Sequence, residues 1–224
     1  MWPKDGGRYR SVRHVSARIV ILTKAPVPGR VKTRLARDIG AEAAATVHEL
    51  MVFETIRLAK QTDLPIILSL ALDDDGRFAE RIETLHVRVE DQASGDLGHR
   101  LTHAMRRPGP SIALGTDCVV FDPRCLVDLD LAPNGACIGP SDDGGYWTIA
   151  LDGSKSEICE AVFAEMPWST PMLFSATEAR LASIGCPVST LPGAYDVDCL
   201  ADLRRLARDP RCAEPLRAAI RPLL

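Results

Sequence analysis

Short apolar runs alternate along the chain with stretches whose apolar residues recur at helical spacing. Residues 18–23 (RIVILT) predict a buried strand, and residues 41–60 predict an amphipathic helix with Glu54 facing outward. Further strands are expected at 65–72, 86–89, 111–115, 136–139, 146–151 and near 188–191. Further helices are expected at 78–82, 97–105, 157–164 and 175–183, and another begins near residue 200.

This alternation predicts the fold class and the domain organisation. Strands separated by helices are typical of a Rossmann-like, three-layer α/β/α sandwich with a mainly parallel sheet, which binds ligands at the carboxyl ends of its strands. No repeat, low-complexity tract or linker divides residues 18–208, so we expect one domain. Residues 209–224 are expected to form a helical tail of that domain. Residues 1–17 are basic without apolar periodicity and predict a flexible extension.

Composition places the chain among ordinary soluble globular proteins. Of its 224 residues, 46% are hydrophobic and 25% charged, which excludes disordered, collagen-like and coiled-coil classes. The sequence contains no run of 18 apolar residues, and the apolar run after the basic start is too short for a signal peptide. The seven cysteines contain no C-x-x-C pair, which favours reduced thiols in a cytoplasm over a disulfide frame or a zinc site.

Charge is distributed unevenly. The net charge is −3, but the first 40 residues hold 10 basic and 2 acidic side chains. An acidic protein with a basic front end is poorly suited to coat nucleic acid, whereas it can bind a small phosphorylated ligand at that end. We therefore expect a small-molecule ligand, with no nucleic-acid partner and no membrane association.

The segment that follows the first strand is the first candidate for ligand binding. It contains two prolines and Gly29, which make it a rigid connector. Lys24, Arg30, Lys32 and Arg34 repel one another unless an anion lies among them, and a polyphosphate suits lysine and arginine donors. The alternative is a solvated basic turn. The spacing is not that of a Walker loop.

Acidic residues follow two of the later elements. Asp117 comes directly after the apolar run at 111–115, where Mg²⁺ held by one or two carboxylates and phosphate oxygens would suit it; the alternative is that Asp117 only caps a turn before Pro123. Asp196 or Asp198 is expected to supply a second metal ligand.

The segment 139–146 lies between two strand-like runs. Gly144 and Gly145 allow close backbone approach to a ligand, and the adjacent Asp143 carboxylate is placed to orient an acceptor or take its proton. The alternative is a plain Asp-Gly hairpin turn.

Taken together, these segments resemble the nucleotide-diphospho-sugar transferase superfamily with its glycosyltransferase-A-like fold. The blocks are K-x-P-x-P-G-x-V-K-T-R-L at 24–35, Q-x-x-G-D-L-G-x-R-L at 92–101, G-T-D-C at 115–118, G-P-x-x-D-G-G-Y at 139–146, P-W-S-T at 167–170 and D-x-D-x-x-x-D-L at 196–203. In this order they resemble the bacterial family described as rSAM/selenodomain-associated transferase and, more distantly, 2-phospho-L-lactate and molybdenum cofactor guanylyltransferases. The chain departs from the usual pattern at Val119 and Cys199.

The resemblance implies roles for particular residues. Nucleotide binding is implied for Lys24, Gly29, Arg30, Lys32, Arg34, Gln92, Gly95 and Asp96. Acceptor binding is implied for Asp143, Gly144, Gly145 and Tyr146, Mg²⁺ (or Mn²⁺) binding for Asp117 and Asp198, and a catalytic role for Lys32, Arg34 and Asp143.

The chemistry separates three hypotheses. A basic loop suits a pyrophosphate leaving group, and the single aspartate of the 115–118 block differs from the D-x-D pair usual in glycosyl transfer. We therefore favour nucleotidyl transfer from a nucleoside triphosphate to a small phosphate- or phosphonate-bearing acceptor. The alternatives are a glycosyltransferase that uses a nucleotide-diphospho-sugar and a nucleotide-binding module without turnover.

Overall fold

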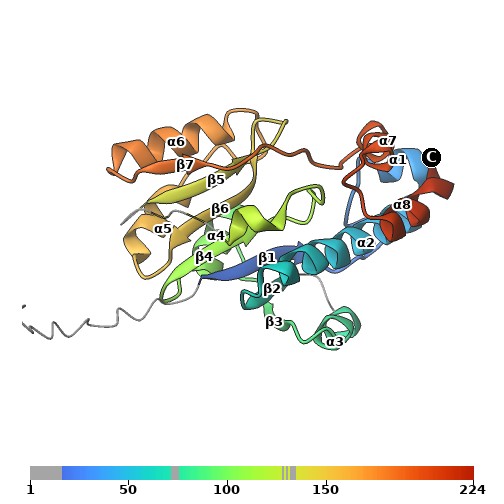
Figure 1. The fold of residues 1–224 in the computed structure, drawn as a ribbon, viewed down its shortest axis with the longest axis horizontal. Helices are drawn as coiled ribbons and strands as arrows, with labels where there is room; N and C mark the ends of the chain where they lie inside the picture. The colour runs from blue at the N-terminus through green and yellow to red at the C-terminus, as the bar shows by residue number, and fades with distance from the viewer. Residues whose placement is uncertain (1–16, 72–75, 128, 130, 132–134) are drawn as a thin grey trace, which may run out of the picture.

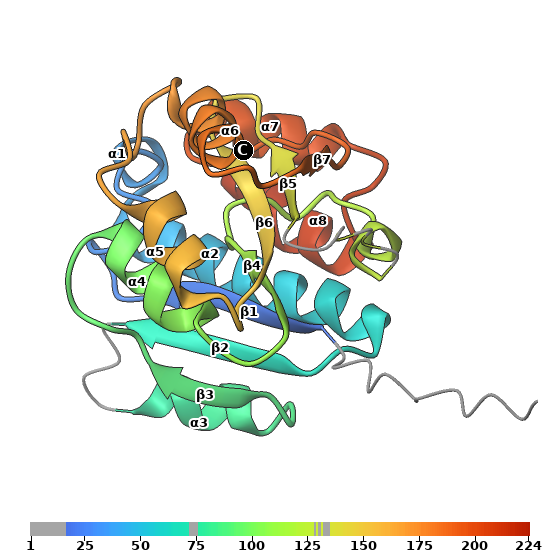
Figure 2. The same ribbon diagram turned by 90° about the vertical axis from the view of Figure 1, so that its left-hand side faces the viewer.

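The computed structural model of the chain describes residues 17–71, 76–127, 129, 131 and 135–224. Its strands are β1 (Arg18–Lys24), β2 (Ile66–Ala71), β3 (Arg88–Asp91), β4 (Pro110–Leu114), β5 (Ala136–Pro140), β6 (Tyr146–Asp152) and β7 (Val188–Thr190). They form one sheet in the order β3-β2-β1-β4-β6-β5-β7. Strands β3, β2, β1 and β4 are parallel to one another and follow one another across Figure 2, and β6 runs antiparallel to both its neighbours. The mainly parallel sheet that the sequence predicts is confirmed.

Helices connect the strands and cover the sheet (Figure 1). The α-helices are α1 (Ala36–Ile39), α2 (Ala41–Ala59), α3 (Arg77–Glu83), α4 (Leu97–Met105), α5 (Ser156–Phe163), α6 (Leu173–Ser183), α7 (Leu200–Arg208) and α8 (Glu214–Ile220). Short 3-10 helices lie at Lys60–Thr62, Pro123–Leu126 and Arg221–Leu223. In the described residues, no helix has the length and apolar character needed to cross a membrane.

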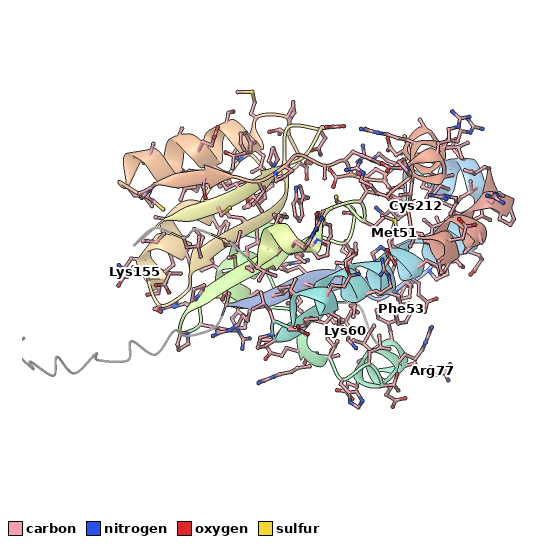
Figure 3. All side chains as sticks on the ribbon, viewed as in Figure 1. Met51, Phe53, Lys60, Arg77, Lys155 and Cys212 are labelled. Atoms are coloured by element: carbon pink, nitrogen blue, oxygen red, sulfur yellow. The ribbon has the colours of Figure 1, made fainter. Side chains whose placement is uncertain are left out.

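Alternate residues of the central strands face two different cores, which establishes the three layers. Ile112 and Leu114 of β4 pack in the core that includes side chains of α2, α3, α7 and α8, whereas Ala113 between them packs with side chains of α4, α5 and α6. Successive side chains of a strand point to opposite faces of the sheet, so β4 is covered by helices on both faces. Figure 3 labels Met51 of α2 and Cys212, which lies two residues before the start of α8; both are buried in the first core.

The tail of the chain packs onto the same core. Helix α8 lies against α2, as Figures 1 and 2 both show, and its Leu216 and Ile220 are buried. The expected extension at 1–17 lies outside the described residues except for Ala17, which packs against the first core. All seven cysteines are free thiols.

The structure differs from the sequence-based predictions in three places. Glu54, expected to face outward, is buried at 7% exposure because α8 packs on α2, and its carboxylate accepts two hydrogen bonds from Arg57 at 2.6 and 2.7 Å. The strand expected at 86–89 begins at Arg88, since His86 has φ +55° and belongs to a turn. Helix α1, which the sequence did not predict, ends at Ile39 and is followed by Gly40, where φ is +86°.

Candidate active site

A cavity of about 480 Å³ opens at the carboxyl ends of β1 and β4. Strand β1 continues through α2 to its neighbour β2, whereas β4 lies on the other side of β1, so the strand order reverses between β1 and β4. Open α/β sheets bind ligands outside the carboxyl ends of their strands at such a reversal of strand order. The basic loop after β1 and Asp117 after β4 both line this cavity.

Lys32 lies at the centre of the charged groups. Its side chain is 3% exposed, and its Nζ donates hydrogen bonds to a carboxylate oxygen of Asp117, to the Val197 carbonyl at 2.7 Å and to Asp198 Oδ1 at 3.2 Å. Burial works to lower the pKa of Lys32, but the two carboxylates outweigh it and raise that pKa above its usual value. The ammonium is therefore charged at neutral pH.

The two carboxylates come from segments far apart in the sequence. Asp117 follows β4; burial works to raise the pKa of its carboxylate, but the charge and hydrogen bond of Lys32 hold that pKa below its usual value. Asp198 precedes α7 and also accepts a hydrogen bond from Arg34, whose side chain is 68% exposed. The backbone N–H of Val197 donates to the Asp117 carbonyl at 2.9 Å, which ties the two segments together.

This donor set suits a hard divalent cation. Two carboxylates and a carbonyl oxygen converge on the ammonium of Lys32, and Mg²⁺ binds protein sites through one or two carboxylates while phosphate oxygens complete its shell. In the described part of the chain, no group of three or more His, Cys, Asp or Glu side chains is arranged to hold a metal ion. Asp117 and Asp198 would therefore need ligand oxygens to complete a metal site.

Asp196 also lines the cavity but belongs to a different cluster. Burial, followed by the negative charges of Asp143 and Asp117, raises its pKa to about 7, while Ser141 hydrogen-bonds to it. Asp143 accepts hydrogen bonds from the Ser141 hydroxyl and from the Gly145 N–H, the latter at 2.9 Å.

The segment 141–145 connects the antiparallel strands β5 and β6, so its backbone is the hairpin that the sequence left as an alternative. Gly144 has φ +87°, and a Cβ there would lie 2.3 Å from the Pro171 carbonyl oxygen. The N–H of Phe174 donates to the Gly144 carbonyl at 2.9 Å. The glycine therefore lets this turn pack against the segment that precedes α6.

Only some of the residues expected to bind nucleotide line the cavity. Lys24, Arg30, Lys32, Arg34 and Gln92 line the cavity together with Asp117, Asp198 and Tyr146.

Six other predicted site residues do not line this cavity in the described structure: Gly29, Gly95, Asp96, Asp143, Gly144 and Gly145. Asp96 caps α4 by accepting the His99 N–H at 2.8 Å, and Gly95 has φ +103° in the turn before that cap. Gln92 donates to the Ser69 carbonyl at 3.2 Å and accepts from Arg100 at 3.1 Å.

Sequence reasoning missed a buried polar cluster beneath the charged groups. His48 of α2 is 6% exposed; its Nε2 lies 3.0 Å from the Lys24 carbonyl and 3.4 Å from the Thr23 hydroxyl, which lies 3.3 Å from the Thr116 hydroxyl. The Nδ1 atom is buried without a hydrogen-bond partner in the described structure. The signal was a histidine on the apolar face of the helix predicted at 41–60. The cluster joins the ends of β1 and β4 to α2.

Apolar residues that line the cavity were also missed. Leu97, Leu101, Trp168 and Leu173 line it together with Tyr146, which was expected to bind the acceptor. The indole Nε1 of Trp168 is buried and has no hydrogen-bond partner among the described residues. Burial raises the pKa of Tyr146, which keeps its hydroxyl protonated. Trp168 belongs to the P-W-S-T block at 167–170, for which the sequence predicted no role.

A protein-family model matches residues 54–170, which is slightly more than half of the chain. Its description is "Uncharacterized protein conserved in bacteria (DUF2064)". The chain belongs to this family. The match includes β2 to β6, Asp117 and the segment 139–146, but not the basic loop or Asp198. No curated protein sequence matches the chain.

Solved structures share the fold. A "putative nucleotide-diphospho-sugar transferase" from Desulfovibrio desulfuricans G20 is 24% identical, with a TM-score of 0.81 over 92% of this chain and 94% of that one. The CTP:phosphocholine cytidylyltransferase of Streptococcus pneumoniae is 16% identical (TM-score 0.57, 86% and 98%), and the inositol-1-phosphate CTP transferase of T. maritima is 9% identical (TM-score 0.58, 92% and 97%). The expected single-domain, glycosyltransferase-A-like α/β fold is confirmed.

Proposed function

We propose that this chain catalyses Mg²⁺-dependent nucleotidyl transfer, with Mn²⁺ as an alternative cation. An acceptor phosphate or phosphonate oxygen attacks the α-phosphorus of a nucleoside triphosphate, a new P–O bond forms, and the bond to the bridging α–β oxygen breaks as pyrophosphate leaves. Such a reaction depends on positioning and charge neutralisation more than on covalent chemistry by the protein. The proposed setting is the cytoplasm.

The observation that carries this proposal is the meeting of three segments at the cavity. Lys32 and Arg34 from the loop after β1 contact carboxylates of Asp117 and Asp198, so two cations of a kind suited to phosphate lie beside two carboxylates of a kind suited to a divalent metal. Lys24 and Arg30 line the same cavity and extend the positive charge available to a triphosphate.

Each group has a role in this proposal. Lys32 and Arg34 bind the phosphates that leave as pyrophosphate, and Asp117 and Asp198 hold the cation. When bound, Mg²⁺ neutralises charge on the phosphate oxygens. Asp198 is favoured over Asp196 as the second ligand, since Asp198 shares the Lys32 ammonium with Asp117, whereas Asp196 hydrogen-bonds with Ser141.

Other residues complete the substrate sites in this proposal. Gln92 lines the side of the cavity proposed for the base and ribose, and Gly95 and Asp96 follow it in the turn before α4. Resemblance to guanylyltransferases makes GTP the first nucleotide to test. Tyr146 lines the cavity near the turn that carries Asp143, Gly144 and Gly145, and this side is proposed for the acceptor. Asp143 there positions the acceptor or takes its proton.

Glycosyl transfer is the second candidate. The observation that favours it is the likeness to the Desulfovibrio desulfuricans protein, whose name refers to nucleotide-diphospho-sugar transfer and whose TM-score of 0.81 exceeds the 0.57 and 0.58 of the cytidylyltransferase and the CTP transferase. The single Asp117 at the end of β4, in place of a D-x-D pair, favours nucleotidyl transfer.

A product assay separates the hypotheses. The full chain is incubated with Mg²⁺ and each of the four nucleoside triphosphates in the presence of phosphorylated acceptors, and separately with UDP-, GDP- and ADP-sugars. Pyrophosphate release that depends on the acceptor supports nucleotidyl transfer. Release of nucleoside diphosphate supports glycosyl transfer, and a thermal shift with nucleotide but without either product supports a binding module.

Asp117→Asn tests the metal assignment. We expect turnover to fall by roughly 10² or more, because a preorganised charge at the reacting phosphates is lost. Asparagine keeps an oxygen that accepts from Lys32, so the free energy of unfolding should fall by only about 1 to 2 kcal/mol. Asp63→Asn is the matched control: Asp63 is exposed and precedes β2 at the opposite edge of the sheet, and its φ of +56° suits asparagine. Full Mg²⁺-dependent activity in Asp117→Asn would contradict the assignment.

A further inference from the structure

Lys32 is held in an unusual way for a loop lysine. Its side chain is 3% exposed, and its ammonium contacts three oxygen atoms from two segments: a carboxylate oxygen of Asp117, the Val197 carbonyl at 2.7 Å and Asp198 Oδ1 at 3.2 Å. Its backbone has φ +45°, in the left-handed region that non-glycine residues seldom adopt. The chain therefore accepts local backbone strain at the position that directs this ammonium between the two carboxylates.

The other basic residues of the loop are placed differently. Arg34 contacts only Asp198 of this carboxylate pair, from a side chain that is 68% exposed. Lys24 lines the same cavity and is exposed. Lys32 and Lys24 carry the same charge in the same cavity but differ in location. A variant of Lys24 is therefore a matched control for a variant of Lys32.

We infer that the Lys32 ammonium is an internal cation that occupies the place of the divalent metal between Asp117 and Asp198 until a nucleotide arrives. This inference rests on the metal and phosphate sites of the proposed function and adds the order in which they fill. Free Mg²⁺ must compete with a buried positive charge for the same oxygens, so the nucleotide-free chain binds it weakly.

Charge balance explains why a nucleotide changes this competition. The carboxylates of Asp117 and Asp198, the Lys32 ammonium and the Arg34 guanidinium sum to a net charge of zero, and adding a divalent cation beside the ammonium brings like charges close together in a site partly shielded from water. The phosphate oxygens of a nucleoside triphosphate supply the negative charge that both cations need. Lys32 then moves from the carboxylates to a phosphate, the metal takes the vacated oxygens, and the binding of metal and nucleotide becomes positively coupled.

The test measures metal binding without turnover. Mn²⁺ is titrated into the full nucleotide-free chain, and free Mn²⁺ is followed by electron paramagnetic resonance, in wild type, Lys32→Met and the control Lys24→Met. We expect Lys32→Met to bind Mn²⁺ at least tenfold more tightly than wild type, because the competing charge is gone. Lys24→Met removes the same charge from the same cavity and should change Mn²⁺ affinity less than threefold.

Two results would overturn the inference. Mn²⁺ affinity in Lys32→Met equal to or below that of wild type would mean that the ammonium holds the carboxylates together for the metal instead of replacing it. An equal gain in both variants would mean that only the net charge of the cavity matters. If Lys32→Met does not fold, Lys32→Gln gives the same comparison, since its amide retains a donor for the Val197 carbonyl.

This readout separates the inference from the proposed function. Chains that release no pyrophosphate but show tenfold tighter Mn²⁺ binding in Lys32→Met would refute nucleotidyl transfer and keep the cation exchange. Pyrophosphate release together with unchanged Mn²⁺ affinity in Lys32→Met would support nucleotidyl transfer and refute the cation exchange.

Discussion

His48 should make the stability of the fold depend on pH. Its ring is 6% exposed, its Nε2 lies against the Lys24 carbonyl at 3.0 Å, and its Nδ1 has no partner within the described structure. A second proton on the ring would create a buried N–H at Nδ1 without an acceptor. Burial lowers the pKa of His48; the Lys24 carbonyl and Asp117 oppose this, and the charges of Lys32 and Lys24 add to it.

The direction of this pH dependence follows from the protonation of His48 in the unfolded and folded states. The unfolded chain binds a proton at His48 with a pKa near 6.5, whereas the folded chain binds it only at lower pH. The contribution of neutral His48 to the free energy of unfolding is therefore complete above pH 6.5. It is lost as pH falls, because the unfolded state gains the proton before the folded state does. Between pH 7.5 and 5.5, one such group lowers the free energy of unfolding by up to about 1.4 kcal/mol.

Urea unfolding at the two pH values measures this contribution. His48→Gln should lower stability at both, but its loss between pH 7.5 and 5.5 should be smaller than that of wild type, by at most about 1.4 kcal/mol. His103→Gln is the control, since His103 is an exposed residue of α4 and should leave the wild-type loss unchanged. If the pH-dependent losses of wild type and His48→Gln agree within about 0.3 kcal/mol, buried His48 does not carry the effect.

Three further outcomes follow from the geometry. Arg34→Ala should weaken nucleotide binding in calorimetry by roughly 1.5 to 3 kcal/mol, the range for hydrogen bonds to charged groups, and unchanged affinity would favour the solvated-turn alternative. Asp143→Asn should lower turnover without altering nucleotide affinity, and a tenfold loss of that affinity would place Asp143 with the nucleotide instead. Gly144→Ala puts a Cβ 2.3 Å from the Pro171 carbonyl oxygen at φ +87° and should destabilise by about 1 to 3 kcal/mol more than Gly185→Ala, where φ is +67° and the space is open; equal melting temperatures would contradict the packing argument.

The apolar pattern predicted most of the fold because the central strands are short apolar runs and most of the helices that cover them carry apolar residues at helical spacing. Helix α4 occupies the predicted residues 97–105, and β1 extends the predicted strand by one residue. The edge strand β3 is displaced by two residues because its limits depend on pairing with β2, where Arg88 lies opposite Ile67. Burial of Glu54 depends on a helix that follows it by about 160 residues and leaves no trace in the local pattern.

The sequence indicated which residues belong to the candidate site, but not how their side chains are arranged. Motif resemblance grouped Lys32, Asp117 and Asp198, but the position of the ammonium between the carboxylates depends on chain segments 85 and 166 residues away from Lys32. Helical periodicity placed His48 in a predicted helix, whereas its polar partners belong to the ends of β1 and β4. Contacts between separate elements are not encoded in the spacing of any one of them.

Strand order explains why opposite charges meet in one cavity. Because β1 and β4 are parallel neighbours, the loops that follow them leave the same edge of the sheet, one with the basic cluster and the other with Asp117. The segment that carries Asp198 is fixed beside them by the hydrogen bond from Val197 to the Asp117 carbonyl. A triphosphate–metal complex contains both signs of charge, so in the proposed function the ion pairs of this site would be exchanged for ligand contacts without leaving a buried charge alone.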